Sequence, residues 1–382
     1  LSPSTIGLYG DWGSGKSSLM KLIQKKIEEK YPKDEKKKDT VKTLCIEFNG
    51  WLFEGYEDTK TSLCGAILDA LTDEKRFSKE VTDYAKELIK KIDINKILGK
   101  GVKYGLDLFL SGGIGILTDL SLSSLLSTIK SSAGEVQAKD IEETLSMLKK
   151  NDKTRTEIKN FRNEFKDLLK KSKVENVVVF IDELDRCLPE TVLEVFEAMR
   201  LFLFVEGMSF VIGADERLIQ YSIKSKYKEV PGNNLDIGKE YLEKVIQYPL
   251  YIPQLTRAEV SQYLACLLLK QTLSDEKFKE ILGIVYTLTP DQDFSMDLIS
   301  DKAPDLTENC KQEMALARQI SSVLAPSISG NPRQCKRFLN TLYMRLELAK
   351  SRNVTLDKNI LAKLMLAEYF NPEFFKAVTI TD

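Results

Sequence analysis

Hydrophobic positions in the first 250 residues alternate between short apolar runs and amphipathic segments. Short apolar runs predict buried strands, here over residues 5–9, 41–48, 177–182, 209–214 and 248–252. Between them, apolar residues recur every three to four positions, which predicts helices after residue 17 and over 58–71, 190–202 and 216–224. Alternation of this kind is typical of a parallel sheet sandwiched by helices. The sequence therefore predicts an α/β fold for this part of the chain.

Beyond Pro253 the pattern is helical only. Helices are predicted over residues 256–270, 275–285, 311–322, 332–350 and 357–368. We therefore expect two domains, a core over 1–253 and a helical C-terminal lid domain over 254–382. The charged, amphipathic stretch that ends near residue 172 indicates a helical insert within the core, at about 76–172.

One part of the insert, residues 106–129, is apolar and rich in Gly and Ser. A membrane-spanning helix needs about 18 to 20 consecutive apolar residues. Asp107 and Asp119 divide this stretch into shorter pieces. A buried or interfacial helical hairpin is the favoured interpretation, and a membrane span is the alternative.

The first strand leads into a glycine-rich loop that matches G-x-x-x-x-G-K-[ST] completely. Its residues are Gly10, Asp11, Trp12, Gly13, Ser14, Gly15, Lys16 and Ser17, followed by Ser18. Glycines allow the backbone N–H groups to turn inward around an anion, and the helix N-terminus adds positive partial charge. Lys16 is predicted to reach the β- and γ-phosphates of a nucleotide, and the Ser17 hydroxyl to bind Mg²⁺. The strand before the loop and the helix after it favour this interpretation over a turn with a chance lysine.

A second candidate element follows the apolar strand 177–182. Asp182 ends that strand, where a P-loop NTPase holds its Mg²⁺ through water. Glu183 is placed to orient or deprotonate an attacking water. The alternative is that both acids only begin a helix. Asp185 is a candidate brace for the site, and Arg186 is either an arginine finger for a neighbouring molecule or a salt-bridge partner of Asp185.

Two further residues are candidates for catalysis. Asp215 follows the strand 209–214, and it reaches the γ-phosphate region if this strand lies between the other two; the equal alternative is a helix N-cap. Asn331 and Pro332 are predicted to cap and open the helix 332–350. Arg333 at this helix start is a candidate to contact bound nucleotide.

Composition narrows the chemistry further. The chain has no histidine, which excludes Ser-His-Asp and Cys-His nucleophiles and His-coordinated zinc. Acid–base work is therefore assigned to a carboxylate, with Glu183 the first candidate. There are 56 basic and 57 acidic residues, so the overall charge favours neither nucleic acid nor membrane. Six scattered cysteines without a C-x-x-C pair indicate a reducing, cytoplasmic setting.

Taken together, these motifs resemble the KAP family of P-loop NTPases. The resemblance rests on Gly10 to Ser17, Phe48-Asn49-Gly50-Trp51, Ile181 to Cys187, Tyr241 to Lys244 with Gln247 and Pro249, and Asn331-Pro332-Arg333 with Lys336, Arg337 and Phe338. It implies an additional-strand P-loop core with sheet order 5-1-4-3-2, a helical C-terminal domain, and ATP with Mg²⁺ as ligands. The run from Phe48 to Asp58 is most similar to the ATPase component of bacterial Qat antiphage defence systems, which implies protein partners from the same operon, including a TatD-type nuclease.

The predicted function is therefore an ATPase that acts as a switch or motor in a multi-protein bacterial defence complex. A homo-oligomer is possible, because Arg186 could complete a neighbour's site. The apolar residues 106–129 leave open a membrane-associated scaffold that uses nucleotide structurally. Lysines 33–42 and the pair Lys336–Arg337 leave open a DNA-sensing ATPase, against which the near-zero net charge counts.

Overall fold

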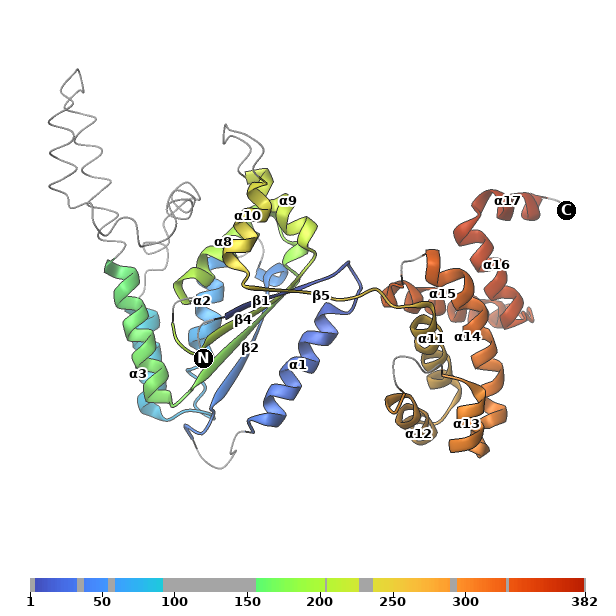
Figure 1. The fold of residues 1–382 in the computed structure, drawn as a ribbon, viewed down its shortest axis with the longest axis horizontal. Coiled ribbons are helices and arrows are strands. Elements are labelled where there is room, and N and C mark those ends of the chain that lie inside the picture. The colour runs from blue at the N-terminus through green and yellow to red at the C-terminus, as the bar shows by residue number, and fades with distance from the viewer. Residues whose placement is uncertain are drawn as a thin grey trace, which may run out of the picture. The chain divides into compact units, whose positions relative to one another are not determined.

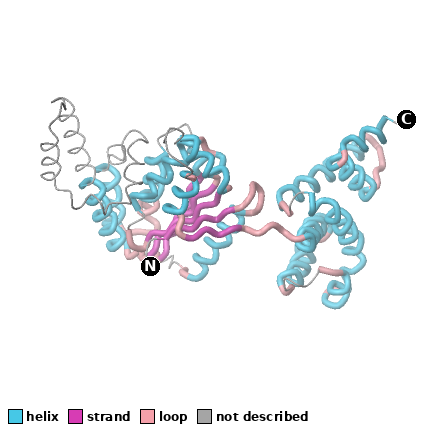
Figure 2. The backbone as a smooth tube through the Cα atoms, turned by 45° about the horizontal axis from the view of Figure 1, so that its top comes forward, coloured by secondary structure: helices cyan, strands magenta, loops and turns pink. Residues whose placement is uncertain are grey.

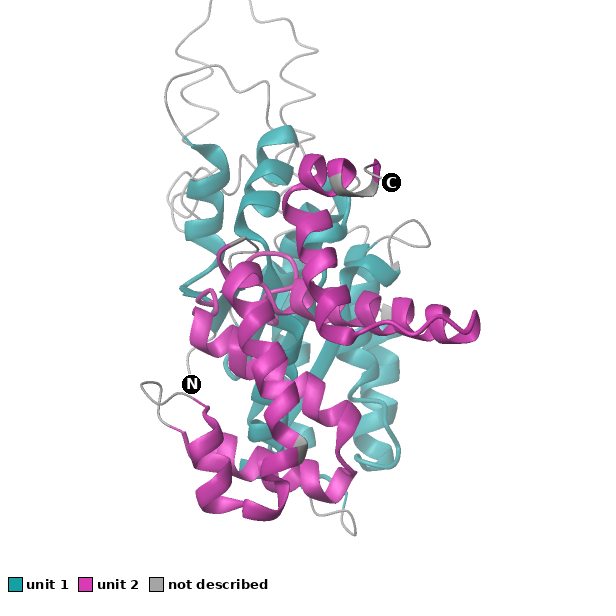
Figure 3. Ribbon diagram, turned by 90° about the vertical axis from the view of Figure 1, so that its right-hand side faces the viewer, with its two compact units in different colours: residues 1–10, 16–251 teal, residues 11–15, 252–382 magenta. Residues whose placement is uncertain are grey.

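The computed structural model describes residues 4–32, 38–53, 59–91, 156–202, 205–226, 236–288, 294–327 and 330–380 (Figure 1). The chain forms two compact units (Figure 3). The first unit contains Leu1–Gly10 and Lys16–Tyr251, and the second contains Asp11–Gly15 and Ile252–Asp382.

The first unit is built on a five-stranded parallel sheet (Figure 2). Its strands are β1 (Ser4–Tyr9), β2 (Thr43–Asn49), β3 (Asn176–Asp182), β4 (Met208–Ala214) and β5 (Tyr248–Tyr251), in the order β2-β3-β4-β1-β5. This confirms the α/β fold and the strand order 5-1-4-3-2. Because β4 lies between β1 and β3, the carboxyl ends of these three strands are neighbours, and the residues that follow them meet at one edge of the sheet.

Helices cover both faces of this sheet. They are α1 (Lys16–Lys30), α2 (Thr59–Asp69), α3 (Lys79–Lys91), α8 (Pro189–Phe202), α9 (Glu216–Lys226) and α10 (Ile237–Val245). Parallel strands are joined by right-handed crossovers, so the connection from β1 to β2 runs on one face and those that return toward β5 run on the other. Accordingly, Figure 1 shows α1 on one face and α2, α8, α9 and α10 on the opposite face.

The core of the first unit is continuous across the sheet and its helices. In β3, Val177, Val179 and Ile181 are fully buried, as expected for an interior strand of a parallel sheet. Residues 156–172 are helical and belong to the insert predicted from sequence. Phe165 in this helix packs edge-on against Phe202 at the end of α8, with 5.0 Å between ring centroids.

The second unit is helical apart from its loop segment. Its helices are α11 (Arg257–Thr272), α12 (Asp275–Tyr286), α13 (Met296–Lys302), α14 (Thr307–Ser327), α15 (Pro332–Ser351), α16 (Lys358–Phe370) and α17 (Pro372–Ile380). The five helices predicted after Pro253 are all present, whereas α13 and α17 were not predicted, nor was α10 in the first unit. A capping box begins α11, where Thr256 accepts from the backbone N–H of Glu259.

Some sequence predictions fall outside the described residues. They include the apolar stretch 106–129 with Asp107 and Asp119, so the hairpin there stays a prediction. Lysines at 33 and 36–37 of the basic loop are also outside them. Among the helices that the structure describes, none is long and apolar enough to cross a membrane.

Candidate functional site

The glycine-rich loop joins β1 directly to α1, which confirms the strand–loop–helix context expected for a phosphate loop. The backbone N–H of Ser14 donates to the carbonyl oxygen of Asp11 at 3.1 Å, so the loop begins with a tight turn. Gly13 and Gly15 have φ angles of +88° and +102°, a region that L side chains rarely adopt. The two glycines therefore allow a backbone path that other residues would strain.

This loop has the features that a phosphate group requires. The Ser14 hydroxyl oxygen is buried and has no hydrogen-bond partner among the described residues. A side chain added at Gly15 would meet open space rather than protein atoms. Ser17 and Ser18, at the N-terminal turn of α1, are exposed. Since α1 directs its positive end toward the loop, the segment fits an anionic ligand.

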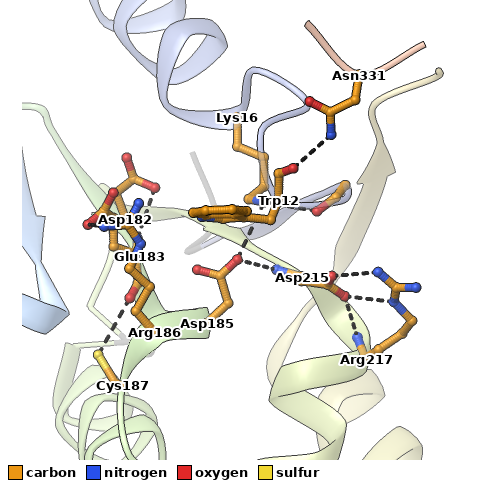
Figure 4. Close-up of polar contacts among 11 residues, drawn as sticks. Trp12, Lys16, Asp182, Glu183, Asp185, Arg186, Cys187, Asp215, Arg217 and Asn331 are labelled. Carbon is orange, nitrogen blue, oxygen red and sulfur yellow. Dashed lines mark hydrogen bonds and ion pairs between the residues drawn. The ribbon is translucent and has the colours of Figure 1, made fainter. Parts of the chain in front are cut away.

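Lys16 is the first residue of α1 and is buried (Figure 4). Its Nζ donates to the carbonyl oxygen of Gly10 at 2.9 Å. It also lies 3.4 Å from Oδ2 of Asp185, an ion pair whose side chains are 8% and 5% exposed. The lysine is therefore folded back against its own loop and held by a buried carboxylate.

At the end of β3, Asp182 and Glu183 adopt the positions predicted for them. Asp182 Oδ1 accepts the backbone N–H of Glu183 at 2.9 Å. Glu183 has φ 61° and ψ 24°, a left-handed conformation that is uncommon for a residue other than glycine. This backbone turn ends the strand and begins the 3-10 turn η3 (Leu184–Arg186). Such strain is typical of residues held in place for function.

The Glu183 carboxylate is paired with Arg186, whose guanidinium nitrogen lies 3.0 Å away. Arg186 also lies over the ring of Trp51, 5.5 Å from its centroid. Trp51 belongs to the 3-10 turn η1 (Gly50–Phe53), which Asn49 caps by accepting the Trp51 N–H at 3.1 Å. The Phe48 to Trp51 motif thus forms a turn against which the Glu183 region packs.

Asp185 links two residues at the carboxyl ends of neighbouring strands, Lys16 after β1 and Asp215 after β4. Its Oδ2, the same oxygen that faces Lys16, accepts the backbone N–H of Asp215 at 3.1 Å. Asp215 follows β4, the strand that lies between β1 and β3. One carboxylate oxygen therefore joins the phosphate-loop lysine to the residue that follows the central strand. The interpretation of Asp185 as a brace agrees with this geometry, and the ion pair with Lys16 was not predicted.

Asp215 serves as a cap for α9, which was one of its two predicted roles. It is only 6% exposed, and it accepts the backbone N–H of Arg217 at 3.0 Å. The Arg217 guanidinium also donates to both carboxylate oxygens, at 3.1 and 2.7 Å. Burial raises the pKa of Asp215, but the hydrogen bonds from Arg217, with smaller effects from the charges of Arg217 and Lys16, hold it below its usual value. Asp215 therefore caps α9 and also lies at the carboxyl end of β4.

Within the second unit, the loop residue Trp12 contacts the start of α15. Asn331 donates through Nδ2 to the carbonyl oxygen of Trp12 at 2.8 Å (Figure 4), and the Arg333 guanidinium lies 3.8 Å from the centroid of the Trp12 ring. Asn331 Oδ1 also accepts the N–H groups of Arg333 and Gln334, and this confirms the predicted cap. The cation–π contact of Arg333 was not predicted.

Two polar features of the site lacked a sequence signal. The pairing of Asp185 with Lys16 joins residues far apart in the chain, and only the sheet order brings them together. Arg217 is an arginine in the first turn of a helix, where acidic residues are the electrostatically favoured choice. No group of three or more acidic or cysteine side chains suited to a metal ion occurs among the described residues. Mg²⁺ at phosphate sites needs only one or two protein ligands besides phosphates and water, so Ser17 and Asp182 fit that pattern.

Comparisons with known proteins place these features in a family. An uncharacterized protein of Methanocaldococcus jannaschii is 27% identical over 178 residues, which cover 45% of this chain and 90% of that protein. A solved structure, of Drosophila ORC bound to DNA, is similar with a TM-score of 0.30 and 13% identity over 89% of this chain. The chain spans 61% of the length of that ORC chain. A TM-score this low supports no statement about shared fold or ligand.

The model of the KAP family P-loop domain matches residues 2–349 of the chain's 382. This match contains the phosphate loop, the acids at the end of β3 and the start of α15. P-loop NTPase domains are nucleotide-binding domains, so a nucleotide is the ligand that membership implies. The chain belongs to the KAP family of P-loop NTPases.

Proposed function

We propose that this protein binds ATP with Mg²⁺, hydrolyses it, and uses the cycle as a conformational switch or motor. The observation that carries the proposal is the arrangement at the edge of the sheet. A glycine-rich phosphate loop with a buried lysine follows β1, and two acids stand at the end of β3, Asp182 as its last residue and Glu183 just after it. Phosphoryl transfer relies on positioning and electrostatic stabilisation, and this arrangement supplies both without histidine.

Each candidate residue has a role in the proposed reaction. The loop N–H groups from Gly10 to Ser18 surround the phosphates, and the Lys16 ammonium neutralises charge on the β- and γ-phosphates. The Ser17 hydroxyl and, through water, Asp182 hold Mg²⁺, which supplies charge neutralisation when bound. Glu183 accepts a proton from the attacking water or orients it.

Asp215 and Arg333 are proposed to report on the nucleotide. Asp215 is tied to Lys16 through the Asp185 carboxylate, so a change at the lysine reaches the start of α9. Arg333 is held over Trp12 of the phosphate loop, which places a cation beside a loop that binds an anion. A switch requires contacts that differ between the nucleotide states. We propose residues 254–382 as a lid domain that provides them.

We place this ATPase in a multi-protein bacterial antiphage complex. The support for this assignment is the sequence from Phe48 to Asp58 and its similarity to the Qat ATPase component. Partner proteins from the same operon, or a second copy of this chain, would couple to the nucleotide cycle. Two measurements test this level of the proposal. The natively expressed protein should co-purify with the products of neighbouring genes, and deletion of the operon should abolish phage protection.

The catalytic proposal is tested by measuring ATP binding and phosphate release together. The parent protein is expected to bind ATP with or without Mg²⁺ and to release phosphate only with Mg²⁺, and Lys16→Ala is expected to lose both activities. Glu183→Gln is expected to bind ATP and lose turnover. Parent-like turnover by both variants would refute the site assignment.

A further inference from the structure

The contact between Lys16 and Asp185 raises a question of charge. The lysine that is proposed to hold phosphate has a carboxylate counterion, 3.4 Å away and almost fully buried. A buried ammonium without a partner is costly, so the Asp185 carboxylate stabilises the charged form of Lys16. A phosphate group that binds Lys16 must displace this carboxylate or share the lysine with it.

The geometry allows such an exchange. The contact of 3.4 Å is longer than the charge-assisted hydrogen bonds of about 2.7 to 2.9 Å that strong N⁺–H···O⁻ pairs form. The lysine's closer bond is with the carbonyl of Gly10, at 2.9 Å. Asp185 retains a second partner, the N–H of Asp215, when Lys16 turns away. The carboxylate can therefore release the lysine without becoming an unpaired buried charge.

We propose that Asp185 is a positioning residue that competes with nucleotide phosphate for Lys16. It holds the lysine beside the loop and thereby lowers the affinity for nucleotide. When phosphate binds Lys16, the Asp185 oxygen is left with the Asp215 N–H alone, so occupancy at the lysine reaches the residue after β4. This inference rests on the proposed nucleotide binding and adds a regulatory contact to it.

A matched variant can separate the charge of Asp185 from its shape. Asp185→Asn keeps an oxygen that accepts the Asp215 N–H and removes the negative charge that faces Lys16. The control is Glu197→Gln, which removes the charge of another buried lysine pair of the first unit, Lys60–Glu197, between α2 and α8. Both variants remove a carboxylate charge from beside a buried lysine, but only one of these lysines faces the phosphate loop.

The experiment measures equilibrium dissociation constants for ATP, ADP and AMP without Mg²⁺, so turnover does not enter. Fluorescence of the protein's two tryptophans, Trp12 and Trp51, or a fluorescent nucleotide analogue reports binding. For Asp185→Asn we expect affinity for ATP and ADP to rise about tenfold, because a gain of roughly 1.4 kcal/mol is modest for a buried charge. Affinity for AMP should not change, because Lys16 serves the outer phosphates. Glu197→Gln should bind all three as the parent does.

Several results would overturn the inference. One is unchanged or weaker ATP binding by a folded Asp185→Asn protein, and another is an equal gain in Glu197→Gln. If Asp185→Asn does not fold alone, saturating ADP should restore its thermal transition, because the phosphates replace the lost counterion. A protein that stays unfolded with ADP contradicts the proposal.

The parent and Lys16→Ala distinguish failure of the proposed function from failure of the proposed role of Asp185. If the parent shows no Lys16-dependent binding of ATP, the proposed function itself fails, whereas binding by the parent without a gain in Asp185→Asn removes only the role of Asp185.

Discussion

Two buried lysine–carboxylate pairs lie in the same unit and differ in what surrounds them. Lys16 and Asp185 sit at the carboxyl edge of the sheet, 3.4 Å apart. Lys60 and Glu197 sit between two helices on one face of the sheet, 2.5 Å apart. All four side chains are at most 8% exposed. Burial and pairing are therefore the same, and neither property identifies which pair serves a ligand.

The difference lies in the parts of the fold that each pair joins. Lys16 donates to a carbonyl of a glycine-rich loop, and Asp185 accepts from the backbone at the end of another strand. Each member can thus change partners while its polar groups stay bonded. The Lys60–Glu197 pair joins α2 to α8 through a short contact. We infer that the first pair is built for exchange and the second for holding two helices in place.

The largest expected effect comes from removing the two lysines in turn. Lys16→Ala should lose nucleotide binding by about a hundredfold or more, because the outer phosphates lose their main side-chain cation. Lys60→Ala should leave affinity unchanged and lower the free energy of unfolding by about 3–5 kcal/mol, because Glu197 becomes a buried, unpaired charge. Isothermal titration and urea unfolding on both variants measure this. Equal loss of affinity in the two variants would remove the distinction between the pairs.

A second large effect is expected at Glu183. Replacing Glu183 by Gln keeps the shape of the side chain and removes its ability to accept a proton. Turnover should fall about 10²- to 10⁴-fold, which is the usual contribution of a general base. The dissociation constant for ATP should stay within about threefold of the parent value, since the lysine and loop are intact. Phosphate release and nucleotide binding are measured on the same sample, and a protein that hydrolyses ATP at the parent rate would exclude Glu183 as the base.

The structural pair can be tested by replacing both of its members. In Lys60→Met with Glu197→Leu, apolar side chains replace the ion pair, and buried pairs replaced in this way are often neutral or stabilising by about 1–4 kcal/mol. Each single replacement should cost stability instead. Thermal unfolding of the two single variants and the double variant gives the coupling between the sites. A double variant whose loss of stability equals the sum of the two single losses would show no coupling between the residues and would contradict a direct link between α2 and α8 through this pair.

Sequence reasoning reached the fold and the local motifs because these depend on neighbouring residues. Apolar runs located all five strands, and the G-x-x-x-x-G-K-S segment located the loop between β1 and α1. Asn331 as a cap also follows from local sequence. The strand order came from family resemblance and not from the pattern itself.

Contacts between distant residues were missed for the opposite reason. The local sequence predicts Asp185 as a brace or as a partner of Arg186, whereas the structure pairs Arg186 with Glu183 and Asp185 with Lys16. The side-chain partner of an acid depends on which strands lie side by side, and periodicity carries no such information. Helices α10, α13 and α17 are nine, seven and nine residues long. Such short helices contain too few turns for a clear apolar period.

The smallest expected effect concerns Asp215, the carboxylate to which the exchangeable pair is linked. Its pKa is raised by burial but held below the usual value overall, chiefly by hydrogen bonds from Arg217. A lowered pKa in the folded state contributes stability above the unfolded pKa of about 4, and this contribution is lost as pH falls through the folded pKa. Arg217→Ala should therefore lower the free energy of unfolding at pH 7 by less than about 1 kcal/mol, because the Arg217 side chain is 75% exposed and solvent screens the pair. The difference from the parent should shrink as pH falls from 5 toward 3. Urea unfolding of both proteins across this range measures it.

Lys16 also lowers the pKa of Asp215, so Lys16→Ala should shift the acid limb of the stability profile in the same direction, and Lys60→Ala should not. A difference between Arg217→Ala and the parent that grows toward low pH would show that Asp215 is not the carboxylate that senses this edge of the sheet.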